Sequence, residues 1–180
     1  MKTSVAAFTF LALAFLTAQP ATAHGPTPQK VEEKISVTAD PKAVWALIAN
    51  FGDVAKWNSE VSASESPEGN TVGATRKLTL KGGATITEDL DEYDPANMTY
   101  SYRLDEGNLE ALPVSFYSAT IKVEPGENGG STVEWFGRLY RGDTGNFPPE
   151  NLNDEAAVKA VSTFFKTGLE SLKSKAEHKS

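Results

Sequence analysis

The sequence predicts an α+β protein in which a curved antiparallel sheet of about seven strands surrounds one long C-terminal helix. Three observations predict this fold. Short alternating segments separated by turn residues fill the middle of the chain, two short helical segments follow the first strand, and a long apolar stripe at helical spacing ends the chain. Alternation with a period of two is typical of strands with one dry face, so we expect antiparallel pairing.

The first 23 residues have the pattern of a secretory signal peptide. Lys2 gives a basic start, an apolar run too short to span a bilayer comfortably follows, and Ala21-Thr22-Ala23 offers the small residues of a cleavage site. An uncleaved anchor is the alternative, which the polar segment after the site disfavours. We therefore expect cleavage after Ala23, export to the periplasm, a flexible arm at 24–30 and a single domain at 31–176.

Charge and cysteine content limit the function classes. The chain of 180 residues has a formal net charge of −7 and no cysteine, and loss of Lys2 with the signal peptide would make the charge −8. An acidic surface repels phosphate backbones and anionic lipids, which argues against nucleic-acid and membrane-surface functions and leaves a basic protein partner as an option. An exported domain without disulfides suits a bacterial periplasm.

The first strand and the two short helices are predicted from residues 31–57. In segment 31–39, alternation places Val31, Glu33, Ile35 and Val37 on one face. Asp40 is a good N-cap, Pro41 suits the first helical position, and an apolar stripe follows at helical spacing. Gly52 is expected to end this helix, and Asp53 to cap a second short turn that carries Val54 and Trp57. The stripe consists of Val44, Leu47, Ile48 and Phe51.

Six further strands are expected before the last helix. Turn-rich segments such as SPEGNTVG, KGG, DPAN and PGENGG separate them. The clearest alternation places Met98, Tyr100, Tyr102 and Leu104 on one face. The predicted strands are 60–65, 73–81, 84–93, 98–104, 114–124 and 131–141.

The last helix is expected from about Leu152 to Lys175. Asn151 or Asn153 could cap it, and two carboxylates in its first turn suit the positive end of the helix dipole. Its apolar stripe consists of Val158, Val161, Phe165, Leu169 and Leu172, with Ala157, Phe164 and Gly168 beside it.

Three segments in this order carry a resemblance to a known superfamily. They are ISVTADPKAVWALIANFGDVAKWN, GATRKLTL followed by ITEDLDEYDPANMTYSYRL, and STVEWFGRL. Over residues 31–175 the chain resembles the START/Bet v 1-like (SRPBCC) superfamily, in its polyketide cyclase/dehydrase-like branch. The resemblance implies the helix-grip fold, with the two short helices closing one end of a groove between the sheet and the last helix.

A narrower resemblance concerns the signal peptide, the HGPTPQKV start and the segment GNFPPENLNDEAAVKAV. These are similar to the MxaD-type periplasmic accessory proteins of bacterial methanol oxidation. That resemblance implies a protein without catalytic activity, whose partners are methanol dehydrogenase and its cytochrome c acceptor. Two alternatives stay open, namely a carrier of a small hydrophobic ligand and an enzyme of the polyketide cyclase or aromatase type.

No catalytic, metal or cofactor site is predicted. The sequence has no cysteine and no G-x-S-x-G motif, and its two histidines, His24 and His178, lie at opposite ends of the mature chain. A copper site at a free His24 is the disfavoured alternative to a simple tail residue. The acidic segment 87–94 does not fit a calcium loop, because the required glycine and final glutamate are replaced by Asp94 and Tyr100.

The acidic segment is interpreted as a solvated strand edge. In a regular strand Glu88 and Glu92 would share a face. The alternative is that Glu88 points inward and pairs with Arg76, since a buried carboxylate needs a partner.

The candidate cavity residues are mainly aromatic. For any one of them ordinary core packing is the favoured interpretation. Two observations favour a hollow interior: Gly168 is costly within a helix, and three tyrosine hydroxyls would need partners if buried. The ligand-binding candidates are Trp57, Arg76, Glu88, Tyr100, Tyr102, Tyr117, Trp135, Phe164, Phe165 and Gly168.

Overall fold

The computed structural model describes residues 25–178, which form one seven-stranded antiparallel sheet and three α-helices. The predicted signal peptide and His24 lie outside the described residues. The sheet order is β1-β7-β6-β5-β4-β3-β2. The elements are β1 (Gln29–Val37), α1 (Pro41–Ile48), η1 (Phe51–Asp53), α2 (Val54–Trp57), β2 (Val61–Glu65), β3 (Thr75–Leu80), β4 (Thr85–Asp94), β5 (Thr99–Glu106), β6 (Val114–Pro125), η2 (Glu127–Gly129), β7 (Ser131–Arg141), η3 (Glu150–Leu152) and α3 (Asp154–Glu177).

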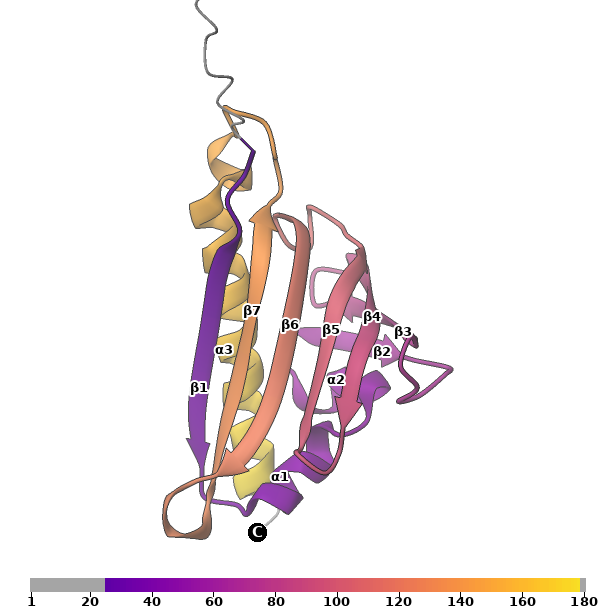
Figure 1. The fold of residues 1–180 in the computed structure, drawn as a ribbon, viewed down its shortest axis with the longest axis vertical. Helices are drawn as coiled ribbons and strands as arrows, with labels where there is room; N and C mark the ends of the chain where they lie inside the picture. Colours follow the sequence, from indigo (N-terminus) through magenta and orange to yellow (C-terminus); the bar gives the residue numbers. More distant parts are fainter. Residues whose placement is uncertain (1–24, 179–180) are drawn as a thin grey trace, which may run out of the picture.

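The long helix α3 lies along one face of β1, β7 and β6, and the sheet bends so that β4, β3 and β2 turn away from this half (Figure 1). The first strand pairs with the last, with Val31 opposite Gly137. The predicted α+β helix-grip architecture is confirmed, and every predicted strand and the last helix end within two residues of their predicted bounds. Strand β1 starts at Gln29, so the last two residues of the predicted arm belong to the sheet.

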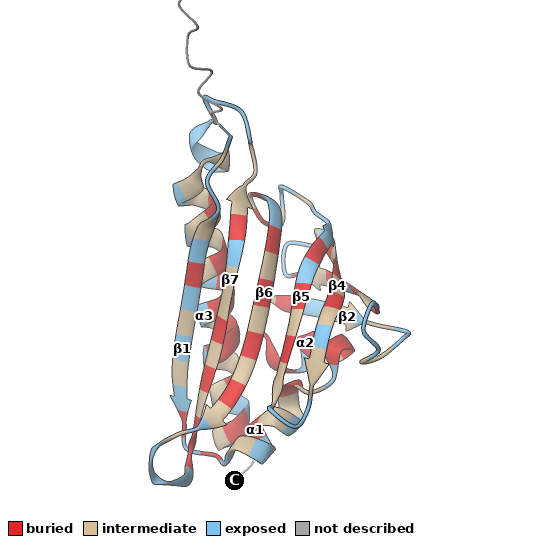
Figure 2. Ribbon diagram, viewed as in Figure 1, coloured by how far each residue is buried: buried red, intermediate tan, exposed pale blue. Residues whose placement is uncertain are grey.

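Alternating burial along the strands places the core between the sheet and α3 (Figure 2). In β5 the side chains of Tyr100, Tyr102 and Leu104 are buried while Arg103 is exposed, as the alternation predicts. Among the described residues, no helix is long and apolar enough to cross a membrane.

Helix α1 is capped as predicted, but the next turn is built differently. The Asp40 carboxylate accepts hydrogen bonds from the backbone N–H groups of Lys42 and Ala43. Gly52 lies inside the 3-10 turn η1, and the Asn50 side chain accepts a bond from its N–H. The expected Asp53 cap is wrong, because the Asp53 carboxylate pairs with the Lys56 ammonium instead.

Helix α3 is fixed at both ends. The Asn153 side-chain oxygen accepts a hydrogen bond from the N–H of Ala156 at 2.9 Å, which confirms one of the two predicted caps. At the other end, the Glu177 carboxylate accepts bonds from the backbone N–H and hydroxyl of Thr38. These contacts hold the helix along the sheet, where its buried face positions the site described next.

Candidate functional site

Aromatic side chains fill the interior between the sheet and α3. The Trp135 ring stacks on Phe165 with centroids 4.3 Å apart, and it lies 5.7 Å from Phe164 and 5.4 Å from Trp57. All four side chains are buried. The structure therefore brings these predicted candidates together, and it packs them against one another.

A buried ion pair lies deeper in the bent sheet. Arg76 and Glu88 are opposite each other in the β3–β4 register, and Arg76 Nε donates to Glu88 Oε2 at 2.5 Å. The guanidinium also donates to the Phe51 carbonyl at 3.1 Å, and its carbon lies 4.1 Å from the Phe51 ring centre and 4.3 Å from that of Tyr102. Although burial alone would lower it, the Glu88 carboxylate raises the pKa of Arg76.

The solvated-edge interpretation of the acidic segment is wrong for Glu88. Strand β4 lies between β3 and β5, so it is not an edge strand. A register shift between Leu90 and Glu92 breaks the regular alternation, so Glu88 is buried while Glu92 is exposed. The inward alternative, with Arg76 as the partner, is the one that the structure has.

Two buried tyrosine hydroxyls have protein partners. Tyr117 donates to the Glu88 carboxylate, and the Tyr102 hydroxyl accepts a bond from Trp135 Nε1 at 2.9 Å. The third tyrosine, Tyr100, lies beside the Arg76 guanidinium, whose carbon is 5.9 Å from the centre of its ring. Burial raises the pKa of all three tyrosines. The Tyr102 and Tyr117 hydroxyls therefore do not require a ligand in order to be satisfied.

Gly168 marks a close approach between α3 and its neighbours. A Cβ atom at this position would lie 2.7 Å from Asn58 Nδ2 and 2.9 Å from Trp135 Cζ3. The space that the glycine leaves is therefore filled by these two side chains, and a larger residue would displace them.

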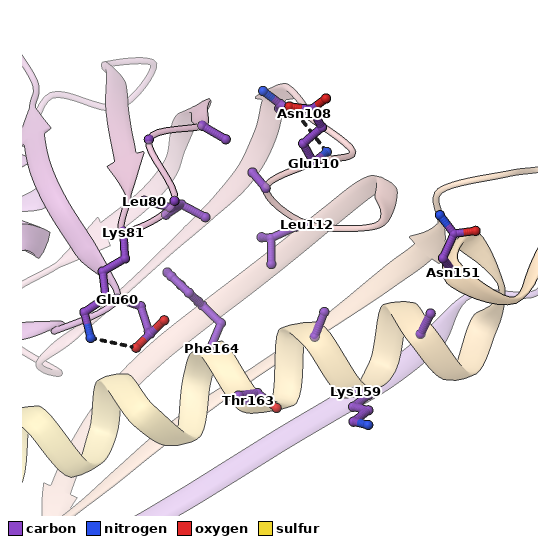
Figure 3. Close-up of a pocket in the computed structure, with 16 residues that line it drawn as sticks. Glu60, Leu80, Lys81, Asn108, Glu110, Leu112, Asn151, Lys159, Thr163 and Phe164 are labelled. Atoms are coloured by element: carbon purple, nitrogen blue, oxygen red, sulfur yellow. Dashed lines mark hydrogen bonds and ion pairs between the residues drawn. The ribbon is translucent and has the colours of Figure 1, made fainter.

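An open cleft of about 970 Å³ lies at the edge of this core, between the N-terminal half of α3, the β3–β4 turn and the loop that connects β5 to β6 (Figure 3). Of the predicted ligand-binding candidates, Phe164 alone lines it. Its apolar lining consists of Leu80, Ala84, Ala111, Leu112, Ala156, Ala160 and Phe164. Its polar lining includes Glu60, Lys81, Asn108, Glu110, Asn151, Lys159 and Thr163.

Polar contacts at the cleft shape its walls. Lys81 and Glu60 form an ion pair at 3.2 Å, and the Asn108 side chain accepts a bond from the N–H of Glu110 at 2.9 Å (Figure 3). The ion pair is well exposed and contributes little stability. Among the described residues, no group of three or more histidine, cysteine or acidic side chains could hold a metal ion. The cleft can therefore bind an apolar molecule, with polar groups at its margin.

Sequence reasoning missed most of the cleft because its walls come from three distant segments. The available signal was the spacing of Ala156, Ala160 and Phe164, which repeats every four residues and places them on one helix face. That signal does not reveal that Leu80 and Leu112 lie opposite this face, since only the folded sheet brings them there.

Comparison with solved structures gives the same fold. An uncharacterized protein from Bacillus thuringiensis is 26% identical with a TM-score of 0.69, over 82% of this chain and 98% of that chain. The protein XoxI from Bacillus cereus is 26% identical with a TM-score of 0.69, over 81% and 94%. Ara h 8.0201 is 22% identical with a TM-score of 0.64, over 84% and 99%, and this shows the fold alone.

The family itself is shown by the sequence. No curated protein matches the chain significantly. The model of the family described as polyketide cyclase/dehydrase and lipid transport matches residues 28–177, which is nearly the whole described domain. The chain belongs to this polyketide cyclase/dehydrase and lipid transport family.

Proposed function

We propose that the protein is a carrier, without catalytic activity, for a small and largely apolar molecule that binds in the cleft. The observation that carries this proposal is the apolar floor of the cleft, where Ala156, Ala160 and Phe164 of α3 face Leu80 and Leu112. Ligand sites of proteins are typically concave and mostly apolar, with few polar groups. The family description, which includes lipid transport, supports the proposal.

The polar interior favours a carrier over a cyclase-type enzyme. A general acid or base must reach its substrate within hydrogen-bond distance. The strongest candidates, Arg76, Glu88 and Tyr117, are bonded to one another in the core, and none of them lines the cleft. At the cleft, Glu60 is engaged with Lys81.

The test is to block the cleft with a tryptophan on its floor. In Ala160→Trp the indole would occupy the apolar floor, whereas Lys166→Trp places the same side chain at an exposed α3 position that does not line the cleft. We expect the fluorescent naphthalene probe 1-anilinonaphthalene-8-sulfonate to bind Ala160→Trp at least about tenfold more weakly than wild type, which corresponds to ~1.4 kcal/mol. Lys166→Trp should bind like wild type. Equal affinity of the two variants would exclude the cleft as the binding site.

A second candidate function is the accessory role in methanol oxidation. It rests on the sequence resemblance and on the net charge of −7, which would orient an encounter with a basic partner. The measurement is the rate of electron transfer from methanol dehydrogenase to cytochrome c with and without the protein. An accelerated rate at low ionic strength that declines as salt is added would support it, because salt screens such steering. An unchanged rate at low ionic strength would exclude it.

A further inference from the structure

Two buried hydrogen-bond donors next to each other in the sequence have no partner within residues 25–178. They are Trp57 Nε1 and Asn58 Nδ2, on side chains that are 1% and 0% exposed. By contrast, Trp135 Nε1 is bonded to the Tyr102 hydroxyl. A buried donor without a partner costs about 1–3 kcal/mol, so two of them on consecutive residues indicate a group that the described chain does not supply.

The local structure fixes Asn58 so that its amide nitrogen faces α3. Its backbone N–H ends α2 by bonding to the Val54 carbonyl at 2.8 Å, and its side-chain oxygen accepts a bond from the N–H of Glu60 at 2.9 Å. The oxygen is therefore used, and Nδ2 is left against Gly168 of α3. Trp57 lies beside it, with its ring 5.4 Å from that of Trp135.

One face of α3 connects the cleft to this place. Ala156, Ala160, Phe164 and Gly168 follow each other at intervals of four residues, and so lie on one face of the helix. The first three line the cleft, while Gly168 contacts Asn58 and Trp135. Phe164 is the one large side chain in this row.

Phe164 lines the cleft and also packs against Trp135, the neighbour of Trp57 and Gly168. Its side chain extends from α3 toward Leu112 and Leu80 at the floor of the cleft (Figure 3). Its ring lies 5.7 Å from Trp135, the residue that contacts both Trp57 and Gly168. A ligand reaches the two donors only when the Phe164 side chain changes its rotamer and Asn58 or Trp135, which fill the space over Gly168, shift as well.

We propose that Phe164 is a gate and that Trp57 Nε1 and Asn58 Nδ2 together bind a carbonyl oxygen of the ligand, which enters the cleft carbonyl first. A carbonyl oxygen has two lone pairs and can accept from both donors, which a hydrocarbon cannot do. The inference rests on the proposed carrier function, since it uses the same cleft. It narrows the ligand class to apolar molecules that carry a ketone, ester or acid group.

The experiment compares two probes that differ in one atom group, 2-acetylnaphthalene with a C=O and 2-isopropenylnaphthalene with a C=CH₂ of nearly the same shape. We expect the wild type to bind the ketone roughly 5- to 100-fold more tightly, from two hydrogen bonds of ordinary strength. Trp57→Phe should lose several-fold of this preference while its affinity for the hydrocarbon stays unchanged. Trp45→Phe is the matched control and should keep the preference, because Trp45 packs against Tyr93 and Tyr100 and lies neither along the cleft nor against Gly168.

Two further measurements test the geometry. The indole N–H resonance of Trp57, assigned by its disappearance in Trp57→Phe, should move downfield when the ketone binds and stay in place with the hydrocarbon. Phe164→Ala should raise the association rate of both probes.

The outcomes separate this inference from the carrier proposal. Equal affinity for the two probes would mean that the donors serve only bound water, which would overturn the inference and leave the carrier function standing. A preference that Trp57→Phe does not reduce would also overturn it. If neither probe bound the wild type or Phe164→Ala, both proposals would be wrong for ligands of this class.

Discussion

Replacing Glu88 by glutamine should destabilise the protein by about 3–5 kcal/mol, because the Arg76 charge would stay buried without a counter-ion. The side chains of Arg76 and Glu88 are 2% and 1% exposed, and the Arg76 Nε–Glu88 Oε2 distance is 2.5 Å. Glutamine has nearly the same shape and can still accept a hydrogen bond from Tyr117. The loss therefore measures the missing negative charge rather than a cavity.

The neighbouring position offers a matched control. Asp89, also in β4, pairs with Arg103 on the opposite face of the sheet at 3.3 Å, and the Arg103 side chain is 45% exposed. Asp89→Asn should therefore cost less than about 1 kcal/mol. The double variant Arg76→Met/Glu88→Leu should recover most of the lost stability, because it removes both charges and leaves apolar side chains in the core.

The assay is urea unfolding followed by circular dichroism and tryptophan fluorescence, with the free energy of unfolding extrapolated to water. Coincident transitions with a common slope would validate the two-state comparison. If Glu88→Gln and Asp89→Asn lost the same stability within about 0.5 kcal/mol, burial would not distinguish the two pairs and the reasoning would be refuted. A double variant less stable than Glu88→Gln would refute it as well.

Four further outcomes are expected. Gly168→Ala should lose about 1–3 kcal/mol in urea unfolding, because the clash with Asn58 and Trp135 exceeds the ~1 kcal/mol gain in helix propensity, whereas Lys166→Ala should be near neutral. Asn153→Ala should lose about 1 kcal/mol in the same assay through the missing cap. Burial raises the pKa of the three buried tyrosines above the unfolded value of about 10. Tyrosines of the unfolded state therefore lose their protons at lower pH, and the free energy of unfolding should fall above about pH 10. Ultraviolet titration should show tyrosinate forming together with unfolding. N-terminal sequencing of the protein purified from its native host should begin at His24, and an intact Lys2 would contradict cleavage.

The elements that sequence predicted well depend on local information. Alternation in β5 and the four-residue spacing along α3 each lie within one segment, and a cap such as Asn153 acts within three residues of its own position. Such patterns involve only residues that are close in the sequence, so they can be predicted without knowledge of the fold. The Asp53 cap failed at the same scale, because Lys56, three residues later, pairs with its carboxylate.

The inward orientation of the Glu88 side chain could not be predicted from local sequence alone. Its segment carries carboxylates on both faces, so alternation alone allows either face to be the dry one. The choice depends on the β3–β4 register, which places Arg76 opposite, and on the irregularity after Leu90, which turns Glu92 outward. Register depends on how two strands pair, and a slip of one residue moves every side chain of a strand to the other face of the sheet.

Aromatic content and hydrogen-bond partners lead to different conclusions about where a ligand binds. Gly168 and the tyrosine hydroxyls favoured a hollow interior, yet the structure shows that Tyr102 and Trp135 satisfy each other and that Tyr117 satisfies Glu88. A polar group that already has a partner gains little from a ligand, whereas one without a partner gains the whole bond. Trp57 and Asn58 are in the second state, so recognition is expected where α2 meets α3 rather than at the ion pair. On this argument a variant that disrupts the ion pair should reduce stability, and ligand preference should change only when the donors or Phe164 are altered.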